Sequence, residues 1–148
     1  MRALILGAAL ALGACATAGD SRLANAEWEA TSLNGAPLVA GSRLTLRLED
    51  GRASGTAGCN RYFGSYDLQG RNSIRFRGVG STRMACAEPL MEQERRYLNI
   101  LENASGYNFY RNGELTVVAA EGRVVRYRRC GCGRPIGEGV RLHPSWLA

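Results

Sequence analysis

Short segments in which apolar and polar residues alternate run through most of the chain. In residues 43–49 a leucine occupies every second position, so the leucines fall on one face. A period of two residues is typical of a half-buried β-strand. Asp50-Gly51 follows as a turn signal, and residues 52–58 are expected to return as the neighbouring strand.

Comparable segments, separated by turns rich in Gly, Asn and Asp, predict further strands. They lie at residues 28–33, 62–68, 73–79, 107–110, 114–119 and 124–128. No repeat of solenoid length and no parallel strand–helix–strand pattern accompanies them. The pattern therefore predicts a mainly β fold, an antiparallel meander interrupted by one α-helix.

The helix is expected at residues 88–104, where Pro89 suits the first turn. One apolar stripe, expected to face the core, consists of Leu90, Tyr97, Leu101 and Ala104, widened by Met91 and Leu98. Glu92 and Arg96 have the i,i+4 spacing of a favourable pair on a helix surface. Solvation is the expected environment of both Glu92 and Glu94.

The chain starts with an apolar run typical of an export signal. Arg2 precedes apolar residues 3–12, a run too short to cross a bilayer as a helix. It ends in Leu-Gly-Ala-Cys, which resembles a bacterial lipobox whose cysteine, Cys15, is acylated. The alternative is a plain secretory signal with an incidental cysteine.

The lipobox predicts how the rest of the N-terminus is used. Residues 1–14 would be removed as a signal peptide, and acylated Cys15 would give the protein a membrane partner. Residues 15–25, small and polar, are expected to be a tether. Ala16, in place of Asp after the cysteine, favours the outer membrane, with the protein facing the periplasm.

The charge of the chain is concentrated near its end. The 148 residues suit one domain, and all 19 basic residues are Arg, against 13 acidic residues and a net charge of +6. Six of the arginines follow position 122, whereas residues 15–122 are neutral overall. This end could contact phosphates of anionic lipid or lipopolysaccharide, or it could simply be solvated. Export argues against a nucleic-acid partner.

Four cysteines remain when Cys15 is set aside. An even number in an exported protein suggests disulfides. Cys130 and Cys132 form a Cys-Gly-Cys pair that could be a redox disulfide, an oxidised loop, or part of a metal site with His143. A zinc site needs four ligands, so no metal is expected here.

Several stretches in order resemble the META domain, or HslJ-like, family. They are "WEATSLNGAPL", "SGTAGCNRYFGSY", "STRMAC" and "MEQERRYLNIL", and the match covers about residues 26–129, leaving residues 130–148 as a C-terminal extension. The resemblance implies a small, strongly curled antiparallel sheet, lipocalin-like and open, with one packed helix. Many members of the family carry a lipoprotein signal. The family is associated with heat-shock response and antibiotic tolerance.

The two motifs suggest which residues matter most. Cys59 and Cys86 lie one in each motif, so a disulfide between them is expected, with free buried thiols as the alternative. The glycines around Cys59 suit a corner of the curled sheet, whereas a phosphate loop would require a Lys-Ser/Thr signature. A family-motif surface is expected at Asn60, Arg61, Thr82 and Arg83, where the arginines either bind an anion or are structural.

No enzyme is predicted, and no cofactor. The one histidine, His143, lies in the extension, and no Gly-x-Ser-x-Gly elbow occurs. The expectation is an anchored envelope lipoprotein with a binding or structural role in stress or antibiotic tolerance and a possible envelope protein partner. The alternatives are a carrier of a hydrophobic ligand inside the curled sheet, and a thiol-redox or metal protein that uses Cys130 and Cys132.

Overall fold

The structure, a computed structural model, describes residues 20–131. Its elements in chain order are β1 (Ala26–Leu33), β2 (Thr45–Glu49), β3 (Arg52–Thr56), β4 (Arg61–Leu68), β5 (Ile74–Ser81), α1 (Glu88–Glu102), β6 (Ala104–Phe109), β7 (Leu115–Ala119), a 3-10 turn at Ala120–Gly122, and β8 (Val124–Arg129). None of the helical segments in this range is long and apolar enough to span a bilayer. The predicted signal peptide, Cys15, Cys132 and His143 lie outside the described residues.

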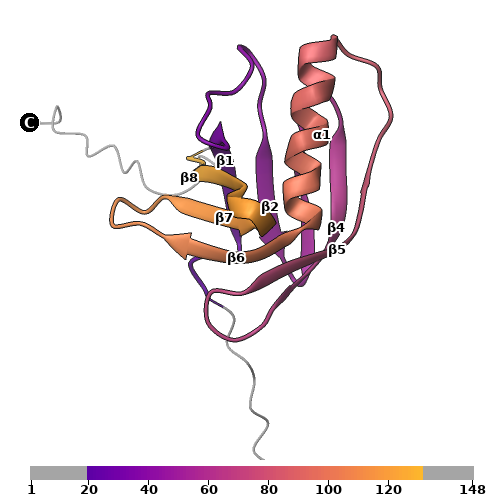
Figure 1. Cartoon of the computed structure of the whole chain (residues 1–148). Coiled ribbons are helices and arrows are strands. Elements are labelled where there is room, and N and C mark those ends of the chain that lie inside the picture. The colour runs from indigo at the N-terminus through magenta and orange to yellow at the C-terminus, as the bar shows by residue number, and fades with distance from the viewer. Residues whose placement is uncertain (1–19, 132–148) are drawn as a thin grey trace, which may run out of the picture.

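All the strands belong to one antiparallel sheet in the order β5-β4-β3-β2-β1-β8-β7-β6. The sheet curls until its two edge strands approach each other (Figure 1). There the Tyr107 backbone nitrogen donates to the Asn72 carbonyl at 2.9 Å, and the Asn72 side-chain nitrogen donates to the Tyr107 carbonyl at 3.0 Å. The expected fold class, an open curled barrel with one helix, is confirmed.

Local sequence accounts for the sharpest turns and bends. Asp50 and Gly51 between β2 and β3 both have positive φ, 48° and 76°, as a two-residue hairpin turn requires. Between β4 and β5 the register shifts near Gly64, where an added Cβ would lie 2.9 Å from the Arg77 carbonyl oxygen. Such bulges increase the bend of a strand pair and help to close a barrel.

Helix α1 covers the inside of the curl with a face that differs from the expected one. Tyr97, Ile100 and Leu101 are fully buried, and Gln93 and Glu94 are buried beside them. The predicted stripe was too wide towards the N-terminus, because Leu90, Met91 and Leu98 are only partly buried. Ala104 is buried, but it belongs to β6.

The interior of the curl is filled by side chains from every strand and from α1. The largest fully buried ones are Trp28, Tyr62, Tyr97, Tyr127, Leu23, Leu44, Leu46, Leu48, Ile74, Ile100, Leu101 and Leu115. They form one hydrophobic cluster, as the alternating leucines of β2 predicted.

The domain begins before the expected boundary at residue 26. Leu23, assigned to the tether, is fully buried, and its carbonyl accepts a hydrogen bond from the Trp28 indole nitrogen at 3.2 Å. At the other end, the Cys130 backbone nitrogen donates to the Glu27 carbonyl at 2.8 Å. The tether prediction was wrong for residues 20–25, because Leu23 is buried in the core and the Asn25 backbone nitrogen donates to the Leu48 carbonyl at 2.9 Å.

Candidate functional site

The motif residue Asn60 lies inside the protein and not on the expected surface. It is 2% exposed and follows the disulfide cysteine Cys59 in the corner between β3 and β4. Its Oδ1 accepts hydrogen bonds from the Met84 backbone nitrogen at 2.7 Å and from the Thr82 hydroxyl at 3.0 Å. Its Nδ2 also donates to the Met84 carbonyl at 3.2 Å. Asn60 therefore fastens the β3–β4 corner to the segment that leads into α1.

Glu94 completes this contact from the helix, against the expectation that solvation explains it. The carboxylate is buried at 5% exposure and accepts two hydrogen bonds from Asn60, one from its backbone nitrogen and one from its side chain, both at 2.8 Å. One signal in the sequence could have revealed it. Glu94 precedes Tyr97 by three residues and Leu101 by seven, which places it on the buried face of the helix.

Gln93, the neighbouring buried polar residue, holds a different loop. Its Oε1 accepts from the Val39 backbone nitrogen at 2.7 Å, and its Nε2 donates to the Ser42 hydroxyl at 2.9 Å. Ser42 in turn donates to the Val39 carbonyl at 2.6 Å. One turn of α1 thus fixes both the β1–β2 loop and the β3–β4 corner.

The disulfide implied by the family resemblance is present beside Asn60. Cys59 and Cys86 are joined, with a Cα–Cα separation of 6.0 Å. Cys86 lies just before α1, so the bond ties the start of the helix to the β3–β4 corner. The stretch "SGTAGCNRYFGSY" is therefore a structural corner secured by a covalent bond and by the Asn60–Glu94 contact.

Three buried tyrosines anchor the rest of the helix. Tyr62 of β4 and Tyr97 of α1 both donate to the Thr45 carbonyl, at 2.6 Å and 3.1 Å. The Tyr127 hydroxyl, from β8, donates to that of Tyr97 at 3.1 Å. Burial, and to a lesser extent the neighbouring phenol groups, raises the pKa of each tyrosine well above its usual value. The cluster is neutral and gives the hydroxyl groups hydrogen-bond partners within the core.

This cluster depends on a local break in the β2–β3 ladder. The Thr45 carbonyl points to the tyrosines, while its side-chain oxygen accepts from the Thr56 backbone nitrogen at 3.0 Å. Gly55 lies against the displaced carbonyl, since a Cβ there would be 2.0 Å from the Thr45 oxygen. The register is the same on both sides of the break, with Leu44 opposite Ala57 and Arg47 opposite Ser54. Gly55 is thus required at this position.

The outer face of the sheet carries the exposed part of the motifs. Arg61, Thr82 and Arg83 are exposed, as expected. Phe63, two residues after Arg61, is 58% exposed, and its ring lies 3.3 Å from the position that a Cβ on Gly80 would take. Phe63 was not among the predicted surface residues, although its alternation with Tyr62 along the strand was a signal for it.

Phe63 and Arg61 line one groove on the outer face, with a volume of about 490 Å³. It is also lined by the small residues Ser54, Gly55 and Thr56 and by the charged residues Arg43, Arg47 and Glu27. Arg43 is paired with Glu29 at 3.3 Å and Arg47 with Glu49 at 3.0 Å. Arg61 forms no ion pair with any residue between positions 20 and 131.

The Cys130 prediction is only partly within the described residues. Cys130 is disulfide-bonded, and its sulfur accepts a hydrogen bond from the Arg43 guanidinium at 3.3 Å. Across residues 20–131 no group of three or more His, Cys, Asp or Glu side chains is arranged to hold a metal ion.

Comparisons with known proteins give a consistent family and fold. The model of the META domain family matches residues 21–130. An NMR structure of a protein from Burkholderia xenovorans is 29% identical, covers 74% of this chain and 84% of its own, and has a TM-score of 0.61. A second NMR structure is 24% identical, covers 72% and 91%, and has a TM-score of 0.60.

The fold extends to a more distant crystal structure, that of a DUF4847 family protein from Bacteroides vulgatus. It is 14% identical, covers 71% of this chain and 92% of its own, and has a TM-score of 0.51. Comparison with curated proteins gave no match. The family match spans the curled sheet, the helix and both disulfide cysteines of the corner, and the chain therefore belongs to the META domain family.

Proposed function

We propose that the protein is an acylated envelope lipoprotein whose META domain binds an envelope protein partner and acts, without catalysis, in envelope stress or antibiotic tolerance. Anchoring through Cys15 places it at the outer membrane, facing the periplasm. The observation that carries the binding role is exposed Phe63 in the groove it shares with Arg61.

Most of the buried polar side chains are occupied in hydrogen bonds within the domain, which supports a binding role for the outer face of the sheet. Gln93, Glu94 and Asn60 are held in contacts between the helix and the loops. The hydroxyl groups of the buried tyrosines are occupied with the Thr45 carbonyl and with one another. A carrier would need an apolar cavity inside the curl, whereas apolar side chains occupy this position. These contacts leave the outer groove as the better binding site.

The chemistry of the groove indicates what it would bind. The exposed Phe63 ring offers apolar contact, the small lining residues allow close approach, and the Arg61 guanidinium can pair with a carboxylate. An exposed segment of a partner protein with an apolar side chain next to an acidic one fits this arrangement. Aromatic and arginine side chains are enriched at the centres of protein interfaces.

The anchoring part of the proposal is tested by metabolic labelling. Wild-type protein expressed with a labelled fatty acid should incorporate label and fractionate with the outer membrane. Cys15→Ser should lose the label and appear in the soluble periplasm. Label retained in Cys15→Ser would exclude acylation at this residue.

The binding part is tested by photo-crosslinking and survival. A photo-reactive phenylalanine analogue at position 63 should give one discrete adduct in living cells. The same analogue at Met84, which is 59% exposed outside the groove, is the matched control and should not.

Survival assays connect the groove to the cell. A strain that lacks the protein should survive heat or antibiotic less well, and Phe63→Ser should fail to restore survival where Met84→Ser succeeds. Full rescue by folded Phe63→Ser would contradict the role of the groove.

A further inference from the structure

The domain starts closer to Cys15 than the sequence suggested. Leu23 is buried, and its carbonyl accepts a hydrogen bond from the Trp28 indole. The Leu23 backbone nitrogen donates to the Asp20 carbonyl, so the chain is already part of the domain at Asp20. Asp20 follows Cys15 by five positions, with four residues between them, and five steps of fully extended chain span at most ~18 Å. With Cys15 acylated, as proposed above, the end of the domain that contains Asp20 lies within about this distance of the membrane surface.

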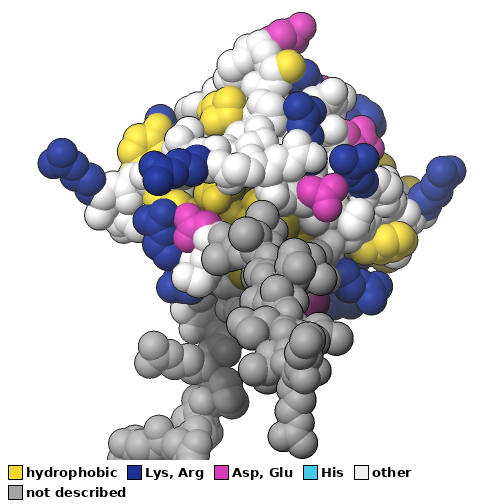
Figure 2. All heavy atoms as spheres, turned by 90° about the horizontal axis from the view of Figure 1, so that it is seen from below, with side chains coloured by type: hydrophobic (Ala, Val, Ile, Leu, Met, Phe, Trp, Pro, Cys, Tyr) yellow, Lys and Arg dark blue, Asp and Glu magenta, His cyan; other side chains and the backbone are white. Residues whose placement is uncertain are grey.

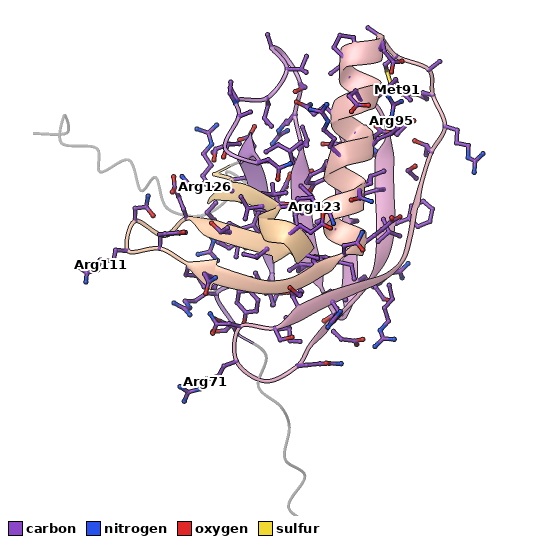
Figure 3. All side chains as sticks on the ribbon, viewed as in Figure 1. Arg71, Met91, Arg95, Arg111, Arg123 and Arg126 are labelled. Atoms are coloured by element: carbon purple, nitrogen blue, oxygen red, sulfur yellow. A yellow bond between two sulfur atoms is a disulfide. The ribbon has the colours of Figure 1, made fainter. Side chains whose placement is uncertain are left out.

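The end of the domain near Asp20 carries a distinctive set of side chains. Arg22, Phe109, Tyr110, Arg111 and Arg129, here called the arginine–aromatic surface, line a hollow of about 600 Å³. The Arg22 guanidinium lies 4.4 Å from the centre of the Phe109 ring. Tyr110 is 52% exposed, and Arg111 projects away from the domain at the end of the β6–β7 hairpin (Figure 3).

More arginines surround this surface. Arg126 lies over the Tyr110 ring at 6.0 Å, and Arg71 projects from the β4–β5 loop (Figure 3), next to Asn72, which is bonded to β6. Seen from below, arginine side chains stand around the periphery of the molecule with fewer acidic side chains among them (Figure 2). Arg71 and Arg111 therefore add positive charge on the side of the domain where the chain enters from Cys15 (Figure 3).

Much of this charge is not neutralised within the domain. Arg22 is paired with Asp20 at 2.8 Å and Arg128 with Glu29 at 3.1 Å. Arg71, Arg111, Arg126 and Arg129 form no ion pair with any residue from 20 to 131. A surface with unpaired arginines beside an exposed tyrosine suits the headgroup region of a bilayer, where guanidinium groups meet phosphates and aromatic rings lie at the interface.

We propose that the arginine–aromatic surface docks onto anionic phospholipid headgroups of the membrane that holds the lipid anchor. Docking sets the orientation of the domain. The N-terminal end of α1, which lies at the opposite end from the entry of the chain (Figure 1), then points away from the membrane. The inference rests on the proposed anchoring, but the surface can be tested without the lipid.

The test uses residues 15–148 with Cys15→Ser and vesicles of phosphatidylcholine with or without phosphatidylglycerol. Flotation should show binding to the vesicles that contain phosphatidylglycerol, and added salt should weaken it. Arg111→Gln with Arg129→Gln should weaken binding about 25-fold, since each arginine near an anionic surface contributes about fivefold. Tyr110→Ser should weaken binding as well, and its effect should persist at high salt.

The matched control is Arg61→Gln with Arg83→Gln. It removes the same charge from two exposed arginines that also lack ion pairs among the described residues, and it should leave binding within about twofold, because both lie near the start of α1 and far from the arginine–aromatic surface. Equal losses in both double variants would show a general charge effect and overturn the proposal. So would wild-type binding that does not depend on phosphatidylglycerol.

Failure of the docking surface can be told apart from failure of the anchor. If the wild type incorporates fatty acid at Cys15 but the Cys15→Ser form shows no preference for phosphatidylglycerol, the anchor is supported and the docking surface is contradicted. Far-ultraviolet circular dichroism and thermal unfolding of each variant verify that the fold is intact.

Discussion

Glu94 and Asn60 form a two-point contact inside the protein, in which the carboxylate accepts from the Asn60 backbone and side-chain nitrogens, each at 2.8 Å. The contact joins residues 34 positions apart and fixes α1 to the β3–β4 corner. It also explains what the asparagine of the Gly-Cys-Asn stretch contributes. Only a side chain with both a donor and an acceptor can serve Glu94 and Met84 together.

Removing the Glu94 carboxylate should destabilise the fold strongly. Glu94→Ala leaves two buried donors of Asn60 without their acceptor, and we expect a loss of about 3 kcal/mol in the free energy of unfolding. Urea unfolding followed by circular dichroism measures it. Glu102→Gln, at an exposed position of the same helix, should stay within about 0.5 kcal/mol of wild type. Equal stability of both variants would show that the contact contributes little.

Gly55 should tolerate no side chain. The Cβ of Gly55→Ala would lie 2.0 Å from the Thr45 carbonyl oxygen, so either the ladder or the tyrosine cluster must shift. We expect a cost of about 3 kcal/mol in thermal unfolding. Gly131→Ala, where a Cβ meets nothing within 4 Å, is the control and should change little. A Gly55→Ala variant as stable as wild type would mean that β2 can shift without a loss of stability.

The tyrosine cluster predicts a loss of stability at alkaline pH. The pKa values of Tyr62, Tyr97 and Tyr127 are raised in the folded protein, so unfolding releases protons once the pH exceeds the unfolded value of about 10. Stability should be constant below that pH and then fall, with a slope approaching ~4 kcal/mol per pH unit for three groups. Tyr97→Phe should show a smaller slope and, by loss of a buried hydroxyl, a stability about 1 kcal/mol lower at neutral pH.

The phenolate absorbance of these tyrosines is the direct measurement. The phenolate forms of Tyr62, Tyr97 and Tyr127 should appear only when the protein unfolds. The rise in phenolate absorbance should therefore follow the loss of the circular dichroism signal. Independent titration of all the tyrosines near pH 10, before any loss of structure, would contradict the burial of the cluster.

The disulfide of the corner should contribute a large part of the stability. Cys59→Ala with Cys86→Ala opens a loop with a sequence separation of 27, and the chain-entropy model gives a loss of about 3.5 kcal/mol. Mutation is preferable to reduction, because Cys130 is also disulfide-bonded. The midpoint of urea unfolding measures the loss. Thiols at 59 and 86 that react with an alkylating reagent in denatured, unreduced protein would rule the bond out.

Leu23 should behave as a core residue and not as part of a tether. It is fully buried in the main hydrophobic cluster, so we expect Leu23→Ala to cost about 3 kcal/mol. Ala40, exposed in the β1–β2 loop, provides a neutral control as Ala40→Ser. Thermal unfolding compares the two. A change near zero in the free energy of unfolding for Leu23→Ala would show that residues 20–25 belong to the tether. It would also weaken the argument for membrane docking.

The sequence by itself determined the strands and the helix. Alternation of leucines predicts β2 because a strand shows opposite faces to core and solvent at every second residue. Asp50-Gly51 predicts the hairpin because both residues tolerate positive φ. These features are local, and a short window of residues is enough to reveal them. The family resemblance then supplied the curled arrangement, the disulfide pairing and the motif residues.

Only the tertiary structure decided what the polar motif residues do. Asn60 looks solvated in its own segment, and the helix period places Glu94 beside Tyr97 without showing its partner. The two become a buried pair because the sheet curls and brings the corner against the helix. The turn of the Thr45 carbonyl towards the tyrosines likewise requires β2, β4, α1 and β8 together. The same holds for the boundary of the domain, since Leu23 is recognisable as core only when the indole of Trp28 lies against it. Contacts between residues far apart in sequence have no local pattern, and they depend on how the whole chain closes.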